Sequence, residues 1–329
     1  MIKILHTADV HLDSPLKSLA LKDEALQAAV QTATRSAFIR IVDTALFEDV
    51  SALLISGDLF DGAERSAKTA SFLIMEMDRL KDAGIPVFYI KGNHDAENPI
   101  TGEVSLPENV HIFDGRGGKV QLGDTNIWIH GVSFAGRHAP ESLLSKFGAP
   151  EPDAVNIAML HTSLAGSQGH DTYAPCSIAD LTKMGFDYWA LGHIHIRQIH
   201  SEAPWIVMPG IPQGRDIGEA GSKSATMISI EDGNISVSEV PTSAAEFVDL
   251  LVNISGIESD DDLRQHIRDV LLNTSQNLTS NAGLLRISLG GVTQRKWQIL
   301  RDQDNWREII AEMARSTGVL WVEKVKFNL

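Results

Sequence analysis

Five short, continuously apolar stretches limit the possible folds of this chain more than any other feature. They are residues 2–5, 52–55, 86–90, 155–160 and 187–191. A continuous run, rather than an alternating one, is typical of a strand buried on both faces of a sheet. Apolar residues at helical spacing lie between the first three, over about residues 22–48 and after a candidate helix cap at Ser66. Strands that alternate with helices predict an open α/β sheet, whose ligands gather at the carboxyl ends of the strands.

Side chains that can bind metal ions follow every one of these stretches. They are Asp9, His11, Asp58, Asn93, His161, His193 and His195. Oxygen and nitrogen ligands without cysteine suit Mn, Fe or Zn in an exposed hydrolytic site, and not a closed structural zinc site. Because Asp58 follows a strand of the central type, we expect its carboxylate to bridge two ions. Ions about 3.5–4 Å apart clamp the attacking and leaving oxygens of a phosphoryl group, and the water between them is the expected nucleophile.

The size and charge of the chain restrict its class. With 329 residues, 43% of them hydrophobic, it can bury a full core and form one large domain and a smaller one. Its 28 basic and 43 acidic residues give a net charge of −15, which argues against a protein that coats nucleic acid. The balance does not exclude a nucleic-acid enzyme, because two divalent cations would reverse the potential where a phosphate binds.

The single cysteine, Cys176, excludes an intrachain disulfide and fits a reducing compartment. The sequence shows neither a secretory signal pattern nor an apolar run of membrane-spanning length. We therefore expect a cytoplasmic protein that does not bind membranes.

The pattern changes around residues 241–245, which indicates a second domain. Alternating and helical segments follow it: residues 247–254, 260–272, 284–289, 306–315 and 319–327. They predict a compact α+β unit without clusters of metal-binding residues. We place the boundary near residue 245, so that residues 1–245 form the first domain and residues 246–329 the second.

The ligand motifs resemble those of a known family. The motifs are Asp9-x-His11, Gly57-Asp58, Gly92-Asn93-His94-Asp95, His161 and Gly192-His193-x-His195, in this order over roughly residues 1–215. This series is similar to that of the calcineurin-like metallophosphoesterases. Within that superfamily, the segments His6–Asp13 and Gly57–Phe60 resemble the SbcD/Mre-type DNA repair exonucleases. Pro209–Arg215 and Trp321–Lys326 resemble the YhaO-like branch most.

The resemblance implies a four-layer α/β/β/α sandwich with a small C-terminal capping domain that helps to select DNA. It assigns the ligands to two ions, one held by Asp9, His11, Asp58 and His195, and the other by Asp58, Asn93, His161 and His193. By the same analogy, His94 is the general acid toward the leaving oxygen and not a ligand. Members of such families usually prefer Mn²⁺, although Fe or Zn is possible, and they work beside a coiled-coil SMC-like or AAA-type ATPase. A homodimer is also possible.

Several residues outside the ligand set have two possible interpretations. Arg215 either binds a substrate phosphate or makes a salt bridge in a turn. Asp61 stands where related nucleases carry a second active-site histidine, and an acidic residue there repels phosphate unless it is paired or protonated. Asp13 and Asp95 are interpreted as turn residues or as residues that orient a ligand imidazole. His6 is interpreted as a core residue, and His130 and His138 as surface histidines, although the last two could approach the cleft; His111, His170, His200 and His266 are left unassigned.

The sequence therefore predicts a two-metal phosphodiesterase that acts as a DNA repair nuclease. One alternative is a phosphodiesterase or phosphatase for small substrates such as cyclic nucleotides, which would have little need of residues 246–329. Another is a regulatory partner of an ATPase, with a metal site that only stabilises the fold. A complete ligand set with His94 beside it argues against the latter, because a structural site needs no proton donor.

Overall fold

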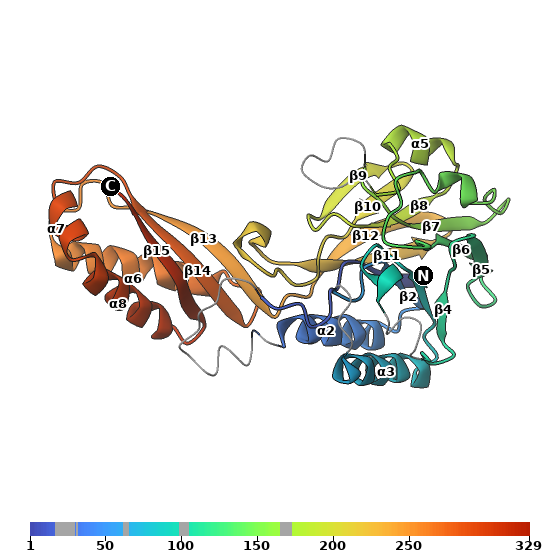
Figure 1. Ribbon diagram of the computed structural model, residues 1–329, viewed down its shortest axis with the longest axis horizontal. Helices are drawn as coiled ribbons and strands as arrows, with labels where there is room; N and C mark the ends of the chain where they lie inside the picture. The colour runs from blue at the N-terminus through green and yellow to red at the C-terminus, as the bar shows by residue number, and fades with distance from the viewer. Residues whose placement is uncertain (17–29, 31, 62–65, 99–104, 165–172) are drawn as a thin grey trace. The chain divides into compact units, whose positions relative to one another are not determined.

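Two six-stranded sheets contain the predicted strands, in a computed structural model that describes residues 1–16, 30, 32–61, 66–98, 105–164 and 173–329 (Figure 1). The first sheet, in the order β12-β11-β1-β2-β3-β4, consists of β12 (Asn234–Pro241), β11 (Ser224–Glu231), β1 (Ile2–Thr7), β2 (Ala52–Ser56), β3 (Val87–Ile90) and β4 (Val110–Ile112). The second sheet, in the order β5-β6-β7-β8-β10-β9, consists of β5 (Gly118–Gln121), β6 (Ile127–Val132), β7 (Val155–His161), β8 (Tyr188–Gly192), β10 (Trp205–Met208) and β9 (Gln198–Glu202). The five apolar stretches thus form β1, β2, β3, β7 and β8, and the strand predictions are confirmed.

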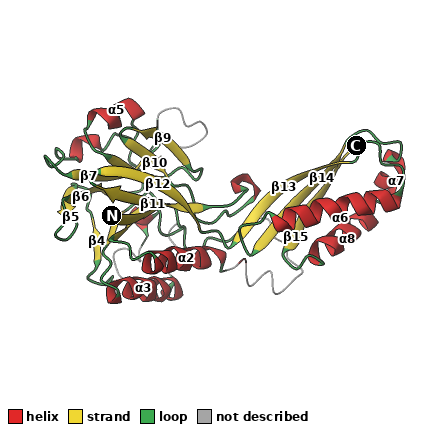
Figure 2. Ribbon diagram, turned by 180° about the vertical axis from the view of Figure 1, so that it is seen from behind, coloured by secondary structure: helices red, strands yellow, loops and turns green. Residues whose placement is uncertain are grey.

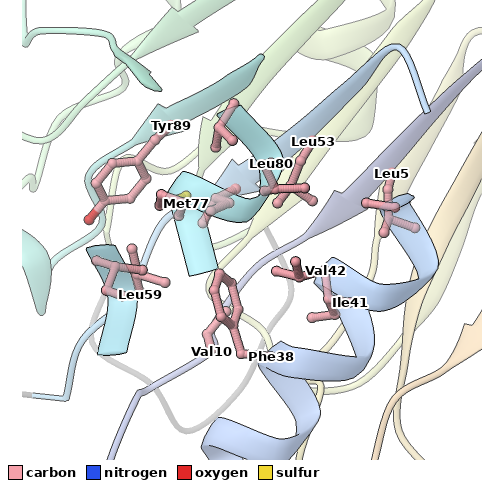
Figure 3. Packing of buried hydrophobic residues seen from close by; sticks show 14 of the residues in the cluster. Leu5, Val10, Phe38, Ile41, Val42, Leu53, Leu59, Met77, Leu80 and Tyr89 are labelled. Carbon is pink, nitrogen blue, oxygen red and sulfur yellow. The ribbon is translucent and has the colours of Figure 1, made fainter. Parts of the chain in front are cut away.

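The central strands are apolar throughout because each packs against two different layers. Leu53 belongs to the cluster that includes residues of α2 (Ala33–Phe47) and α3 (Ala67–Asp82), and Leu54 to the cluster shared with the second sheet. Figure 2 shows α2 and α3 together at the first sheet, and Figure 3 shows the packing around Leu53. Since successive strand residues point to opposite faces, both must be apolar. A Leu53→Ala change would cost about 2–5 kcal/mol of stability.

The outer face of the second sheet carries a further apolar cluster. It includes Leu181 of α5 (Ile178–Lys183) together with Trp189 of β8, both fully buried. The side chain of Ser177 accepts a bond from the Asp180 backbone, and the Asp180 side chain reaches back, so a capping box starts this helix. The unit is therefore a four-layer α/β/β/α sandwich, as predicted. Of the helix predicted over residues 22–48, residues 22–29 and 31 lie outside the described residues, and residues 33–47 form α2.

A second compact unit contains β13 (Ala245–Asn253), β14 (Ala282–Gly290) and β15 (Leu320–Asn328) in one parallel sheet. The helices α6 (Asp260–Gln276), α7 (Lys296–Arg301) and α8 (Gln303–Arg315) connect the strands. Leu263, Ile287 and Trp306 are among the residues that form its core. The first unit contains Met1–Ser14, Thr34–Pro212 and Lys223–Thr242, and the second also contains Gln213–Ser222. The division into a catalytic domain of residues 1–245 and a capping domain of residues 246–329 stays a prediction.

His130 corrects one sequence-based interpretation. It is 1% exposed in β6, where its Nε2 lies 3.0 Å from the Asn156 side-chain oxygen and its ring meets Phe186 edge-on. The prediction of a surface histidine was wrong because β6 pairs on both sides, with β5 and β7, and is covered by the outer layer. His6, in contrast, is a core residue as predicted and is 0% exposed. Among the described residues, no helix combines the length and the apolar character needed to cross a membrane.

Candidate metal centre

The candidate ligands lie where parallel strands of both sheets end. In the first sheet β1, β2 and β3 are parallel neighbours, and in the second β7 and β8 are. The residues that follow these strands, or that end them, are the seven ligands predicted from the sequence. Parallel strands present their carboxyl ends at one edge, so five loops far apart in the sequence meet there.

Four of these residues have a backbone conformation that is rare outside glycine. Asp9, His11, Asp58 and His193 have φ values of 53°, 45°, 51° and 103°. Such conformations cost of order 1–3 kcal/mol each and concentrate at functional sites. Backbone hydrogen bonds hold the loops after β1 and β2 in this conformation, since Asp9 N donates to Gly57 O at 2.9 Å and His11 N donates to Asp58 O at 3.1 Å.

The side chains form three overlapping clusters. In each cluster one donor atom per residue lies within 4.8 Å of the others: Asp9, His11 and His195; His11, Asp58 and His94; and Asp58, His161 and His193. Asn93 completes the set, because its Oδ1 lies 3.2 Å from Nε2 of His161. Asp58 belongs to two clusters and is 2% exposed, so it is placed to be shared between two ions. The structure thus brings together all seven predicted ligands and His94.

The donor separations fit cations. Nε2 of His11 lies 3.3 Å from Nε2 of His195, and Nε2 of His161 lies 3.4 Å from Oδ2 of Asp58. Two imidazole nitrogens that face each other need a proton or an ion between them. Two ligands each about 2.1 Å from one ion are roughly 3–3.4 Å apart at octahedral to tetrahedral angles. The residues present therefore suit a pair of divalent ions.

Hydrogen bonds behind the ligands set which atoms face the centre. The Nδ1 of His161 donates to Ser56 O at 2.9 Å, so that Nε2 faces Asn93 and Asp58 and can bind a cation once its proton is lost. The carboxylate of Asp9 accepts the backbone N–H of His193 at 2.9 Å. Ligand geometry is thus fixed by the surrounding chain and not by the ions alone.

The charges of the centre are strongly coupled. Burial alone would lower the pKa of His161, but the carboxylates of Asp58 and Asp9 raise it to about 9. Burial alone would raise the pKa of Asp58, but the adjacent imidazolium of His161 lowers it. Without metal, the two residues therefore form a buried ion pair at neutral pH, and an incoming cation must displace the proton of His161.

Asp95 connects two of the ligand loops. It is 0% exposed, and its carboxylate accepts the N–H of Gly92 and the N–H of Phe60, each at 3.0 Å. Burial and the neighbouring charge of Asp58 raise the pKa of Asp95 to about 6. These bonds connect Asp95 to backbone groups of the loops after β2 and β3. From the sequence, Asp95 is interpreted as a turn residue or as a residue that orients a ligand imidazole. The long-range bond to Phe60 has no signal in the sequence.

His94 differs from the ligands in its exposure. Its side chain is 33% exposed, against 1% for His11, and its backbone N–H donates to Oδ1 of Asp58 at 2.9 Å. Asp61 lies beside both imidazoles, with its Oδ1 3.4 Å from Nδ1 of His11 and 3.6 Å from Nδ1 of His94. Asp61 therefore forms an ion pair whenever one of these rings is protonated, which is the condition under which it can lie near a phosphate.

Two other residues singled out in the sequence form ion pairs of their own. Arg215 belongs to the second unit and pairs with Glu219, with Nη2 3.1 Å from Oε1. The structure thus has the salt bridge that was one of the two interpretations, and the phosphate-binding role stays a prediction. The carboxylate of Asp13 accepts bonds from Nε and Nη2 of Arg35 and from the Thr69 hydroxyl, which anchors the loop after β1 to α2 and α3.

Comparisons with known proteins show which sequences and structures the chain is similar to. The family model for calcineurin-like phosphoesterases matches residues 2–197, and that for the middle domain of metallophosphoesterase YhaO matches residues 247–329. The chain is 38% identical over 240 residues to the uncharacterized metallophosphoesterase YhaO of Bacillus subtilis (strain 168), covering 71% of this chain and 59% of that protein. It is 26% identical over 330 residues to the DNA double-strand break repair protein Mre11 of Sulfolobus acidocaldarius, covering 92% of this chain and 80% of that protein. Among solved structures, a dimetal phosphatase from Danio rerio aligns with 73% of this chain and 96% of its own, at 11% identity and a TM-score of 0.47.

Proposed function

The chain belongs to the calcineurin-like phosphoesterase family, and we propose that it is a two-metal phosphodiesterase that hydrolyses DNA. One observation carries the proposal: two donor sets share the buried carboxylate of Asp58, and the partly exposed imidazole of His94 lies beside them. A shared carboxylate favours two ions over one. A proton donor next to them favours catalysis over a purely structural site.

Each residue has a role in this proposal. As the family resemblance implies, Asp9, His11, Asp58 and His195 would hold one ion, and Asp58, Asn93, His161 and His193 would hold the other. When bound, two divalent cations would polarise the phosphoryl oxygens and activate water as the nucleophile. The mixed carboxylate, amide and imidazole set favours Mn²⁺, with Fe or Zn as alternatives.

His94 completes the chemistry on the other side of the phosphate. Its backbone is fixed by the bond to Asp58, while its side chain reaches toward solvent. In this position it delivers a proton to the leaving sugar oxygen as the ester bond breaks. The carboxylate of Asp61, 3.6 Å from Nδ1 of His94, orients the ring so that its other nitrogen faces the substrate.

DNA as substrate rests on the relatives. One relative, aligned over 92% of this chain, is a DNA double-strand break repair protein by name, and residues 247–329 match a domain found in a metallophosphoesterase. With a net charge of −15, the chain has little general attraction for DNA, so the ions must provide local attraction. We extend the proposal to a cytoplasmic location and a coiled-coil ATPase partner, which copurification from cells would test.

Hydrolysis by the purified chain tests the proposal. We expect cleavage of labelled duplex DNA with Mn²⁺, none in excess chelator, and recovery when Mn²⁺ is restored. Asp58→Ala should lower bound metal from about two ions toward zero, because both donor sets lose a member. Asp124→Ala, a change of an exposed turn carboxylate in the same unit, is the matched control and should keep both ions and full activity.

Three outcomes would contradict the proposal. Full activity of metal-free protein would exclude metal-dependent hydrolysis. Retention of both ions by Asp58→Ala would exclude the bridge. If the protein hydrolyses small phosphodiesters but does not cleave DNA, its activity is restricted to small substrates.

A further inference from the structure

A row of aromatic rings leads from the candidate ligands to the surface of the first unit. The ring of Phe134 meets His161 edge-on at 5.6 Å between centroids, and it stacks on Tyr173 at 6.3 Å. Tyr173 meets His193 edge-on at 5.2 Å. On Tyr173 lies the ring of His138, nearly parallel at 12° with a centroid distance of 6.5 Å. This is an offset stack, one of the arrangements that aromatic pairs prefer.

Tyr173 is fixed close to the metal centre by backbone bonds. Ser163, two residues after the ligand His161, donates its N–H to Tyr173 O at 2.8 Å. In return, Tyr173 N donates to the hydroxyl of Ser163 at 3.1 Å. The N–H of Ala174 donates to Ala139 O, which ties the segment that carries His138 to the one that carries Tyr173. The stack is thus built on the scaffold that positions His161.

Burial explains the inner rings but not the outer one. Phe134 and Tyr173 are 3% and 8% exposed and belong to the apolar cluster on the outer face of the second sheet. His138 is exposed and polar, so the removal of apolar surface from water does not account for its place. The ring of His138 lies parallel to the buried ring of Tyr173, at the outer end of a row that starts at two candidate ligands. Such an arrangement can receive another flat ring on its outer face.

We propose that His138, supported by Tyr173, is the stacking platform for a nucleobase next to the scissile phosphodiester. The inference rests on the proposed function and deepens it, because it names the part of the substrate that the chain contacts beyond the phosphate. Stacking needs no particular base, since every base has a π-face. It also needs no positive charge, which suits a chain with a net charge of −15. The ions hold the phosphate, and the platform holds the base beside it.

A pair of DNA dinucleotides tests the platform. One carries 2-aminopurine beside the phosphodiester, and the other has an abasic residue at that place. We expect His138→Ala to lower kcat/KM about tenfold for the 2-aminopurine substrate and to leave the abasic substrate within about twofold of wild type, because tenfold lies within the range that stacking of a base on one aromatic side chain contributes. His138→Trp, which restores a larger ring, should match or exceed wild type on the 2-aminopurine substrate only.

His111→Ala is the matched control, because His111 is an exposed histidine that packs on Phe113 at 4.6 Å in the first sheet. It should change neither substrate. The inference is contradicted if His138→Ala slows both substrates equally, if His111→Ala has the same effect, or if His138→Trp fails to restore the rate.

A binding measurement separates this inference from the proposed function. The probe is a hydrolysis-resistant phosphorothioate dinucleotide that contains 2-aminopurine, and it is titrated with full-length protein in Mg²⁺. Wild type and His138→Trp should quench its fluorescence, and His138→Ala should not. Quenching without hydrolysis of any phosphodiester would overturn the proposed function and keep the platform. Hydrolysis without quenching would keep the function and overturn the platform.

Discussion

At the scale of single residues, the centre assigns different tasks to side chains of one type. His161 is fully buried, with one nitrogen on a backbone carbonyl and the other toward Asn93 and Asp58. His94, next to Asn93 in the sequence, is one-third exposed, with its backbone N–H bonded to Asp58 and its ring beside His11 and Asp61. The first environment suits a ligand and the second a proton donor. The sequence could predict the cluster of histidines but not which of their nitrogens would be available.

His94→Asn tests the proton donor. We expect both ions and substrate binding to persist while kcat on a DNA dinucleotide falls about 10²–10⁴-fold, the usual contribution of general acid catalysis. The defect should be much smaller on a nitrophenyl phosphodiester, because nitrophenolate departs without a proton. Equal slowing on both substrates would show that His94 is not the acid, and loss of metal from the variant would make it a ligand.

At the scale of strands and loops, the sequence was informative wherever a strand is buried on both faces. β2 and β3 could be predicted because both of their faces are buried. The candidate ligands Asp58 and Asn93 could be predicted because they follow the apolar runs of these strands. Contacts between segments far apart in the chain could not be predicted. The burial of His130 depends on its neighbours β5 and β7, and the stack of His138 on Tyr173 depends on two loops meeting. Neither leaves a periodic pattern in the sequence.

His6 in β1 gives the first sheet a dependence on pH. Burial, assisted by the charge of Arg197, lowers the pKa of His6 to about 3, against an ordinary value of 6.5. The neutral ring is bonded to the Tyr188 hydroxyl and to Leu191 O, each at 3.1 Å. The unfolded chain therefore binds a proton that the folded chain excludes, so this stability is fully present above pH 6.5 and is lost as the pH falls toward 3.

Urea unfolding of metal-free protein measures this effect. Between pH 6.5 and 3, His6 should contribute a loss of up to about 1.4 kcal/mol per pH unit. His6→Gln should be less stable than wild type at pH 8, because it loses bonds inside the core, but its stability should fall less steeply in acid. Parallel pH profiles for the two proteins would exclude His6 as the source.

At the scale of the whole molecule, all the ligands lie in the first unit, while residues 247–329 match a different family model. The second unit has a core of its own, built from its parallel sheet and the helices α6 and α8. Composition predicted a large and a small unit, and the change of pattern near residue 245 predicted where the second begins. The sequence did not predict that Gln213–Ser222 would belong with it, since Gln213 bonds to the backbone of Ala244 and Ala245 across a long stretch of chain.

Deletion of residues 246–329 tests the division of labour. Because the first unit contains every ligand, the truncated chain should still hydrolyse a small chromogenic phosphodiester. Cleavage of duplex DNA should fall strongly if the second unit selects DNA. Circular dichroism and bound metal control for folding, and an equal loss on both substrates by a folded, metal-loaded truncation would contradict a DNA-selecting role.

We propose that Asp58 bridges two ions, and anomalous X-ray diffraction from crystals grown with Mn²⁺ would observe such a bridge. We expect two Mn²⁺ peaks about 3.5–4 Å apart, with one carboxylate oxygen of Asp58 next to each. Asp9, His11 and His195 should contact one ion, and Asn93, His161 and His193 the other. A single peak, or two peaks that do not share Asp58, would contradict the bridge.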